Sequence, residues 1–205
     1  MGNSTAKDKH DGQAGASSKV FSDGEKENGR LEWIEGDVYE GGFKDDKYDG
    51  SGLYTRAGNT YCCTWKNGKQ NGPGTMVCKY DCDNEVADKG IYIGDWKNGL
   101  FHGVGKMSYI GHNEYKVHDG EWKGDKFGGL GTLEFVDGRT YKGGIKNDVM
   151  DGEGTLISED GSEQEGVFKK NKLVVDIDVL TGEMTSGIHA VKNIDDAVSK
   201  RAHII

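Results

Sequence analysis

Cysteines are the first candidates for chemistry in this sequence, because all four lie between Cys62 and Cys82. Cys62 and Cys63 are adjacent, so on a strand their thiols point to opposite faces and cannot readily bind one zinc ion together. With Cys78 and Cys82 they give the spacing C-C-x14-C-x3-C. Over a zinc site we favour reduced thiols in a cytoplasmic protein, packed as small apolar side chains.

Two other segments resemble ligand-binding motifs without completing them. The segment Gly103-Val104-Gly105-Lys106 lacks the earlier glycine, and also the Ser or Thr after the lysine, that a phosphate-binding loop requires. A short acidic run could supply calcium ligands, but Val86 stands where an EF-hand loop needs glycine. That run consists of Asp81, Asp83, Glu85 and Asp88. A solvated loop is the interpretation that we favour there.

The remaining candidates for catalysis are histidines, and both have a structural explanation. His102 precedes a pair of glycines in a predicted hairpin, and His118 takes the place of a tyrosine in a repeated pattern. The sequence contains no nucleophile elbow and no identifiable acid–base pair. It therefore favours a non-catalytic protein without a metal or cofactor.

The composition limits the fold and the partners that would position any such residues. Glycine supplies 34 residues and proline one, a composition that argues against a helix bundle and excludes collagen. Aromatic residues make up 9% of the chain, more than disordered proteins usually contain. The net charge of −9 disfavours nucleic acid as a partner. No apolar run reaches the length of a membrane span, and the N-terminus has no apolar signal core.

An internal repeat organises the chain. An aromatic–glycine–aromatic segment recurs at intervals of 22, 31, 26, 23 and 23 residues. The two longer intervals contain insertions at about residues 80–90 and 110–116, which we expect to form enlarged loops. The copies are YEGGF at Tyr39, YCCTW at Tyr61, YIGDW at Tyr92, HDGEW at His118, YKGGI at Tyr141 and QEGVF at Gln164.

Each repeat predicts a β-hairpin. Tyr39, Gly41 and Phe43 alternate with other residues and so share one face of a strand, and a polar turn then leads into a second strand. That second strand begins with a glycine doublet, which we expect to leave bare backbone on which aromatic rings can lie. A single hairpin is marginally stable, so the hairpins must stack. The doublets are Gly50/Gly52, Gly72/Gly74, Gly103/Gly105, Gly129/Gly131 and Gly152/Gly154.

The repeated pattern Y-x-G-x-[FW]-x-x-[GN]-x-x-x-G-x-G resembles the MORN repeat (membrane occupation and recognition nexus). It covers about residues 37–172, as five full copies and a sixth half copy. Departures from it are Cys63, His118 and Ile145. The resemblance implies an all-β fold: an elongated, single-layer, twisted antiparallel sheet of stacked hairpins with a shallow aromatic groove.

The resemblance also implies a function, that of a scaffold or adaptor in cytoskeletal, ciliary or membrane-associated assemblies, often as a homodimer. An extended or helical segment of a protein partner would bind along the groove. The alternative for any one ring is that it only holds the sheet together. The expected groove residues are Tyr39, Phe43, Tyr61, Trp65, Tyr92, Trp96, Trp122, Tyr141 and Phe168.

A second hypothesis is a phosphoinositide- or membrane-binding module, or a regulatory subunit of a lipid kinase, because the family is associated with these lipids. Residues 31–172 carry 18 basic and 25 acidic side chains, so their net charge of −7 opposes anionic lipids unless the lysines segregate. One lysine does recur directly after each second aromatic position. These candidate lipid-contacting residues are Lys44, Lys66, Lys97, Lys123, Lys146 and Lys169.

The two ends differ from the repeat array of residues 31–172. Residues 1–30 predict a disordered arm, whose Gly2 is a candidate for myristoylation although Ala6 replaces the preferred Ser or Thr. Residues 173–205 predict one or two strands and then a short helix from about Asn193. Such a helix would cap the last hairpin, or alternatively bind a partner or a second copy.

Overall fold

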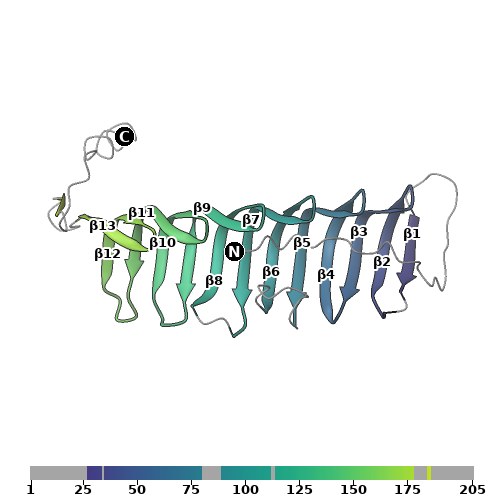
Figure 1. The fold of residues 1–205 in the computed structure, drawn as a ribbon, viewed down its shortest axis with the longest axis horizontal. Coiled ribbons are helices and arrows are strands. Elements are labelled where there is room, and N and C mark those ends of the chain that lie inside the picture. The colour runs from purple at the N-terminus through teal and green to yellow at the C-terminus, as the bar shows by residue number, and fades with distance from the viewer. Residues whose placement is uncertain (1–26, 34, 80–88, 112–113, 178–183, 186–205) are drawn as a thin grey trace.

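The computed structural model describes residues 27–33, 35–79, 89–111, 114–177 and 184–185. These residues form one antiparallel sheet of fourteen strands, in which each strand pairs with its neighbours in the sequence (Figure 1). The predicted all-β, single-layer fold is thereby confirmed. Gly2, the acidic run at 81–88 and the predicted C-terminal helix lie outside the described residues.

The strands follow the predicted hairpins closely. The first seven are β1 (Glu27–Glu32), β2 (Val38–Lys44), β3 (Lys47–Arg56), β4 (Asn59–Lys66), β5 (Lys69–Cys78), β6 (Gly90–Lys97) and β7 (Leu100–Tyr109). The others are β8 (Tyr115–Lys123), β9 (Lys126–Phe135), β10 (Thr140–Lys146), β11 (Val149–Ile157), β12 (Glu163–Lys169), β13 (Lys172–Ile177) and the two-residue β14 (Met184–Thr185). The expected insertions fall between β5 and β6 and between β7 and β8.

Six two-residue turns join the strands of each repeat along one edge of the sheet. Both residues of every one of these turns have positive φ, as a type I′ turn requires. Such turns match the right-handed twist of the strands, which is why Asn, Asp and Gly dominate them. The turns are Asp45-Asp46, Asn67-Gly68, Asn98-Gly99, Gly124-Asp125, Asn147-Asp148 and Lys170-Asn171.

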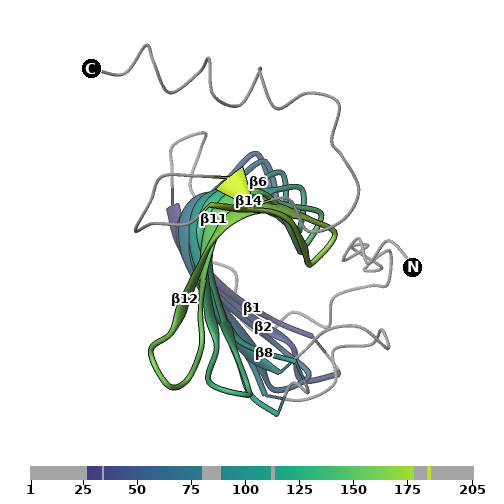
Figure 2. The ribbon, with the colours of Figure 1, turned by 90° about the vertical axis from the view of Figure 1, so that its left-hand side faces the viewer.

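The sheet is bent across its strands, so that its end view has the outline of a C (Figure 2). Register shifts lie close to the repeated glycines, for example between Gly41 and Phe43 and between Gly94 and Asp95. Bulges of this kind bend a strand and increase its twist. The first glycine of each doublet has positive φ, from 65° at Gly103 to 132° at Gly152. It therefore serves the bend, whereas the second glycine lies under a ring in four of the five doublets.

The core lies on one face of the sheet, which we call the inner face; the opposite face is the outer face. Rings at equivalent positions of the inner face are fully buried although the described residues form no second layer over them. The two wings of the bent sheet must therefore enclose this face between them. Buried side chains on it include Tyr39, Phe43, Trp65, Tyr92, Trp96, Trp122, Phe127, Leu133, Tyr141 and Phe168.

The array begins earlier than the sequence indicated. Strand β1 starts at Glu27, inside the segment expected to be a disordered arm, and pairs with β2 from Glu27↔Phe43 to Glu32↔Val38. Gly29 explains the pairing, since a Cβ there would lie 3.1 Å from the Phe43 ring. A glycine that looked like part of a flexible arm therefore accommodates the first ring of the core.

Candidate binding surfaces on the inner face and the lysine edge

Tyrosines that open the repeats are anchored inside the bend. Tyr39, Tyr92 and Tyr141 are each 0% exposed. Their hydroxyls donate hydrogen bonds to the backbone oxygens of Gly42, Asp95 and Gly144 at 2.9, 2.9 and 3.0 Å. Burial, together with the negative charge of Asp151, raises the pKa of Tyr141 to about 12. These hydroxyls therefore remain neutral donors at physiological pH.

Each of these rings lies on a glycine of the facing strand. A Cβ added to Gly105 would come within 2.6 Å of Cζ of Tyr92, and Gly154 stands in the same relation to Tyr141. An aromatic ring from the next repeat then packs edge-on against each tyrosine, for example with the Tyr92 and Trp122 centroids 5.5 Å apart at 86°. The Trp122 indole Nε1 donates to the Gly105 carbonyl at 2.9 Å. Consecutive repeats are thus joined through both rings and backbone.

The second repeat departs from this arrangement because Cys63 replaces a glycine. The Cys63 thiol occupies the space over Gly74, where an added Cβ would lie 2.5 Å from its Sγ. Tyr61 is consequently only half-buried and lies against Tyr54, with centroids 6.0 Å apart. Burial, with a smaller contribution from Cys62, raises the pKa of the Cys63 thiol to about 12.

In the fourth repeat, too, a residue other than the repeat's first tyrosine fills the space over the second glycine of the doublet. His118 stands in the tyrosine position, and its Nδ1 lies 3.0 Å from the Tyr109 hydroxyl. The His118 ring stacks on Phe127, at 4.9 Å and 11°. Phe127 in turn fills the space over Gly131, where an added Cβ would meet its ring at 2.6 Å. His118 is 3% exposed and is part of the packing of the inner face.

Most of the predicted groove residues are core residues in the structure. Eight of the nine are at most 6% exposed, and Tyr61 is the half-buried exception. The partly exposed rings packed against this core are mainly ones that the sequence reasoning missed. They are Trp33, Tyr48, Tyr54, Phe101 and Tyr109. Tyr48 and Phe101 could have been found, since each follows a hairpin turn at the same offset.

Three of these rings form a continuous group with the half-buried Tyr61 near the start of the array, which we call the aromatic patch; its members are Trp33, Tyr48, Tyr54 and Tyr61. Its centroid separations are 6.1 Å for Trp33–Tyr54, 6.4 Å for Tyr48–Tyr54 and 6.0 Å for Tyr54–Tyr61. Tyr54 lies at its centre. The patch is the part of the inner face where several neighbouring rings keep some exposure.

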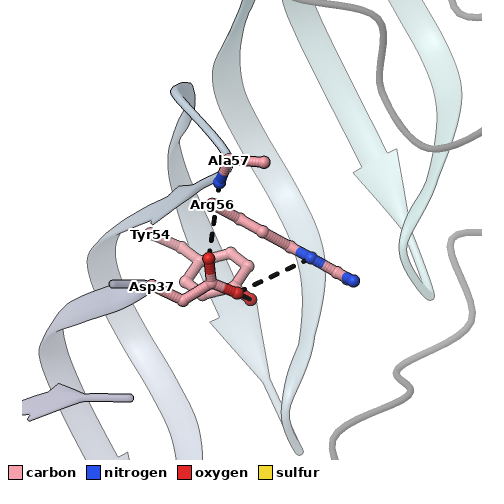
Figure 3. Close-up of polar contacts among 4 residues, drawn as sticks. All are labelled: Asp37, Tyr54, Arg56 and Ala57. Carbon is pink, nitrogen blue, oxygen red and sulfur yellow. Dashed lines mark hydrogen bonds and ion pairs between the residues drawn. The ribbon is translucent and has the colours of Figure 1, made fainter. Parts of the chain in front are cut away.

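Asp37 holds the hydroxyl group of Tyr54 in place (Figure 3). Its carboxylate accepts hydrogen bonds from the Tyr54 hydroxyl at 3.2 Å and from the Ala57 N–H at 3.3 Å, and pairs with Arg56 Nε at 3.6 Å. Burial and the Asp37 charge raise the pKa of Tyr54. Asn59 makes the equivalent backbone contact one repeat later, because its Oδ1 accepts a hydrogen bond from the Lys79 N–H at 2.9 Å. The patch therefore rests on a fixed polar support.

All six predicted lipid-contacting lysines are exposed, and each ends the first strand of its repeat. The structure brings them to the edge that carries the two-residue turns, which we call the lysine edge. Register pairing adds four further lysines that the sequence reasoning missed. The cross-turn pairs are Lys44↔Lys47, Lys66↔Lys69, Lys123↔Lys126 and Lys169↔Lys172. The K-x-x-K spacing across these four turns was the sequence signal for the additional lysines.

The lysine edge is positively charged, although the chain as a whole is negatively charged. Its six four-residue segments begin at residues 44, 66, 97, 123, 146 and 169. Together they hold eleven lysines and four aspartates, a net charge of +7, whereas the whole chain has −9. Anionic groups would therefore meet a positive potential at this edge.

The cysteines lie as the alternation of a strand predicts. Cys62 is exposed on the outer face, whereas Cys63 and Cys78 are buried. Among the described residues, no three His, Cys, Asp or Glu side chains are grouped so that they could hold a metal ion. The same part of the chain has no helix long and apolar enough to cross a membrane.

Stacked hairpins of about 23 residues, each adding two strands to one sheet, define a β-repeat protein. A sequence model of the MORN repeat matches residues 39–61, 61–79, 92–113, 118–138 and 141–163. These matches cover more than half of the chain, which therefore belongs to the MORN-repeat family. No curated protein gave a match. MORN repeats are generally non-catalytic modules that bind proteins or membranes.

Proposed function

We propose that this protein is a non-catalytic scaffold or adaptor that binds a segment of a protein partner on its inner face. The observation that carries the proposal is the aromatic patch: Trp33, Tyr48, Tyr54 and Tyr61 are contiguous and only half-buried. Partly exposed Trp and Tyr side chains on a rigid support are typical of protein-binding hot spots.

Charges beside the patch support a mixed apolar and polar contact. Arg56 pairs with Asp37 but keeps about a third of its side chain exposed, at 32%. A partner segment could therefore place an apolar side chain on the rings and an acidic group near Arg56. The proposed setting is a cytoplasmic, cytoskeletal or membrane-associated assembly, by analogy with the family.

The test uses substitutions at partly exposed rings. Trp96 and Trp122 are 6% and 5% exposed, so replacing them would measure folding rather than binding. We would instead compare wild-type protein with a Trp33→Ala, Tyr61→Ala double variant in affinity capture from native cells. Partners that the double variant loses would support the proposal.

The matched control is a Val104→Ala, Leu130→Ala double variant, which removes two exposed side chains from the outer face, 64% and 69% exposed. It should retain the same partners. If the folded Trp33/Tyr61 variant captured an unchanged set of partners, the inner-face proposal would be wrong.

The lysine edge favours a second candidate function, binding to anionic membranes such as those containing phosphoinositides. Lysine pairs near a membrane surface each contribute attraction that salt weakens. Myristoylation of Gly2 would add one anchor, and mass spectrometry of the N-terminal peptide of native protein tests it.

Flotation with phosphatidylcholine vesicles, with and without a phosphoinositide, tests the lysine edge at two salt concentrations. Unacylated protein should float with the anionic vesicles at low salt only. A variant with Lys66, Lys69, Lys123 and Lys126 changed to Gln should lose this binding. The control changes two lysines of the outer face, Lys106 and Lys142, to Gln. Equal binding by both variants would contradict the membrane hypothesis.

A further inference from the structure

One row of side chains crosses the outer face of the first eight strands. Strand register places its members side by side, one on each strand from β1 to β8. The row runs directly beside the bulges and glycines of the bend, and therefore along the part of the outer face that projects furthest. In order, its members are Arg30, Glu40, Leu53, Cys62, Thr75, Ile93, Lys106 and Asp119.

The four central members of this row, on β3 to β6, are uncharged, and three of them are exposed. Leu53 is 42% exposed and Ile93 58%, and Ile91, in the adjacent row of the same strand as Ile93, is 37% exposed. Cys62 is also exposed between them in the register. Neighbouring apolar side chains on a surface indicate an interaction site more strongly than isolated ones do.

The flanks of the row carry charges in a self-complementary order. From the β1 end the row reads positive, negative, apolar, and from the β8 end it reads negative, positive, apolar. Lys106 and Asp119 already form an ion pair at 3.3 Å, with both side chains 47% exposed. A surface that presents opposite charges at equal distances from its centre can pair with a second copy of itself.

We propose that two copies of this protein associate outer face to outer face, about a two-fold axis that lies between β4 and β5 and runs parallel to the strands. This axis places each strand opposite a different strand of the second copy: β4 on β5, β3 on β6, β2 on β7 and β1 on β8. Leu53 then meets Ile93 of the second copy, Glu40 meets Lys106, and Arg30 meets Asp119.

The charges select this axis over the other face-to-face arrangement. A two-fold axis along the length of the sheet would set each strand on its own equivalent, so that Glu40 would face Glu40 and Lys106 would face Lys106. Like charges at such an interface are strongly unfavourable. Of the two rows beside the central one, the row farther from the lysine edge is uncharged from β2 to β7 and therefore opposes neither arrangement; its members are Val38, Thr55, Thr60, Val77, Ile91 and Ser108.

The contact should be weak and reversible. Sheets that pack face to face lie about 10 Å apart, and only the projecting part of each bent sheet would come this close. The buried area would then be at the small end of specific interfaces, below about 1,200 Å². Apolar side chains would supply the affinity and the charge pairs the orientation. The contact involves neither the aromatic patch nor the lysine edge.

Sedimentation of the full chain up to about 0.5 mM, a range that includes weak complexes, tests the proposal. The mass should rise with concentration from 22.3 kDa towards twice this value. Glu40→Lys and Lys106→Glu should each weaken self-association at least about tenfold, since each places like charges in contact twice per dimer. The double variant carrying both changes should associate like the wild type.

An equimolar mixture of the two single variants gives the sharpest test. Each chain then supplies the charge that the other needs, so heterodimers should form although neither variant pairs with itself. Lys142→Glu, which alters the same outer row on β10, beyond the contact, should leave association unchanged. A wild type that stays monomeric, or single variants that associate normally, would overturn the proposal. A double variant or a mixture that does not associate would overturn the axis.

Discussion

The Cys63 thiol lies over Gly74 in the position that a tyrosine ring occupies in three other repeats, and a Cβ at Gly74 would be only 2.5 Å from its Sγ. One substitution thus moves Tyr61 out of the bend and into the aromatic patch. The same relationship between a side chain and a facing glycine recurs along the array. It leads to predictions that can be tested one residue at a time.

Replacing the glycine under a ring should destabilise the sheet. In Gly105→Ala the new methyl group would overlap the Tyr92 ring, whose Cζ is 2.6 Å from the ideal Cβ. Overpacking of this kind costs about 1–3 kcal/mol, which chemical denaturation can measure. Gly128→Ala is the control, since its Cβ would have ordinary contact with the Ile145 oxygen at 3.6 Å. Equal stability of the two variants would contradict the proposed role of the glycine.

Adjacent thiols should differ sharply in reactivity. Cys62 is exposed, whereas Cys63 is 4% exposed and burial raises its pKa to about 12. Alkylation of the folded protein, followed by fragment mass spectrometry, should label Cys62 and leave Cys63 unmodified even at pH 9. Denaturant should expose both. Labelling of Cys63 in folded Cys62→Ser protein would show that the core of the second repeat opens readily.

Asp148→Asn should stabilise the protein, and more at pH 7 than at pH 4. Burial raises the pKa of Asp148, although its Oδ1 accepts the Phe127 N–H at 2.8 Å. A raised carboxyl pKa gives a stability contribution that is complete at low pH and lost as the pH rises through the folded-state pKa. Asparagine keeps the acceptor and does not ionise. Asn171 already accepts from Met150 N–H in this way at 2.8 Å.

Asp160→Asn should change stability with the opposite sign and pH dependence. Hydrogen bonds from the Ser162 hydroxyl and N–H lower the pKa of Asp160. The contribution of this carboxylate is therefore present at neutral pH and lost in acid, so its substitution should lower the melting temperature at pH 7 but not at low pH. Parallel pH profiles for the two Asn variants would contradict the assignment for Asp148.

Lys170→Asn should stabilise the last two-residue turn. Lys170 has φ of 49°, and it is the only first turn residue of the six that is not Asp, Asn or Gly. A left-handed conformation costs an ordinary residue about 1–2 kcal/mol of free energy, and this cost is smaller for asparagine. We expect a gain of about 0.5–1 kcal/mol in the free energy of unfolding. Lys170→Gln removes the charge without improving the turn, so an equal gain from it would point to charge alone.

Local periodicity explains how much of the fold could be predicted. Alternation with a period of two fixed the strands, and turn residues fixed the hairpins, because both signals reside in consecutive residues. The start of β1 was missed, since the role of Gly29 becomes clear only from its contact with Phe43, a residue of the next strand. The predicted groove of nine rings also rested on spacing along the chain alone. Spacing indicates which face a ring shares, and not how much of the ring a bent sheet covers.

The sequence by itself determined the repeat, its hairpins and the single face on which the rings gather, because these follow from distances along the chain. Only the tertiary structure decided which rings are buried, which glycine of each doublet bends the strand and which carries a ring. It also decided that the lysines on both sides of four turns share one edge, and that opposite charges flank the uncharged centre of a row on the outer face. These relationships depend on strand register and curvature, which arise when neighbouring repeats pack against one another.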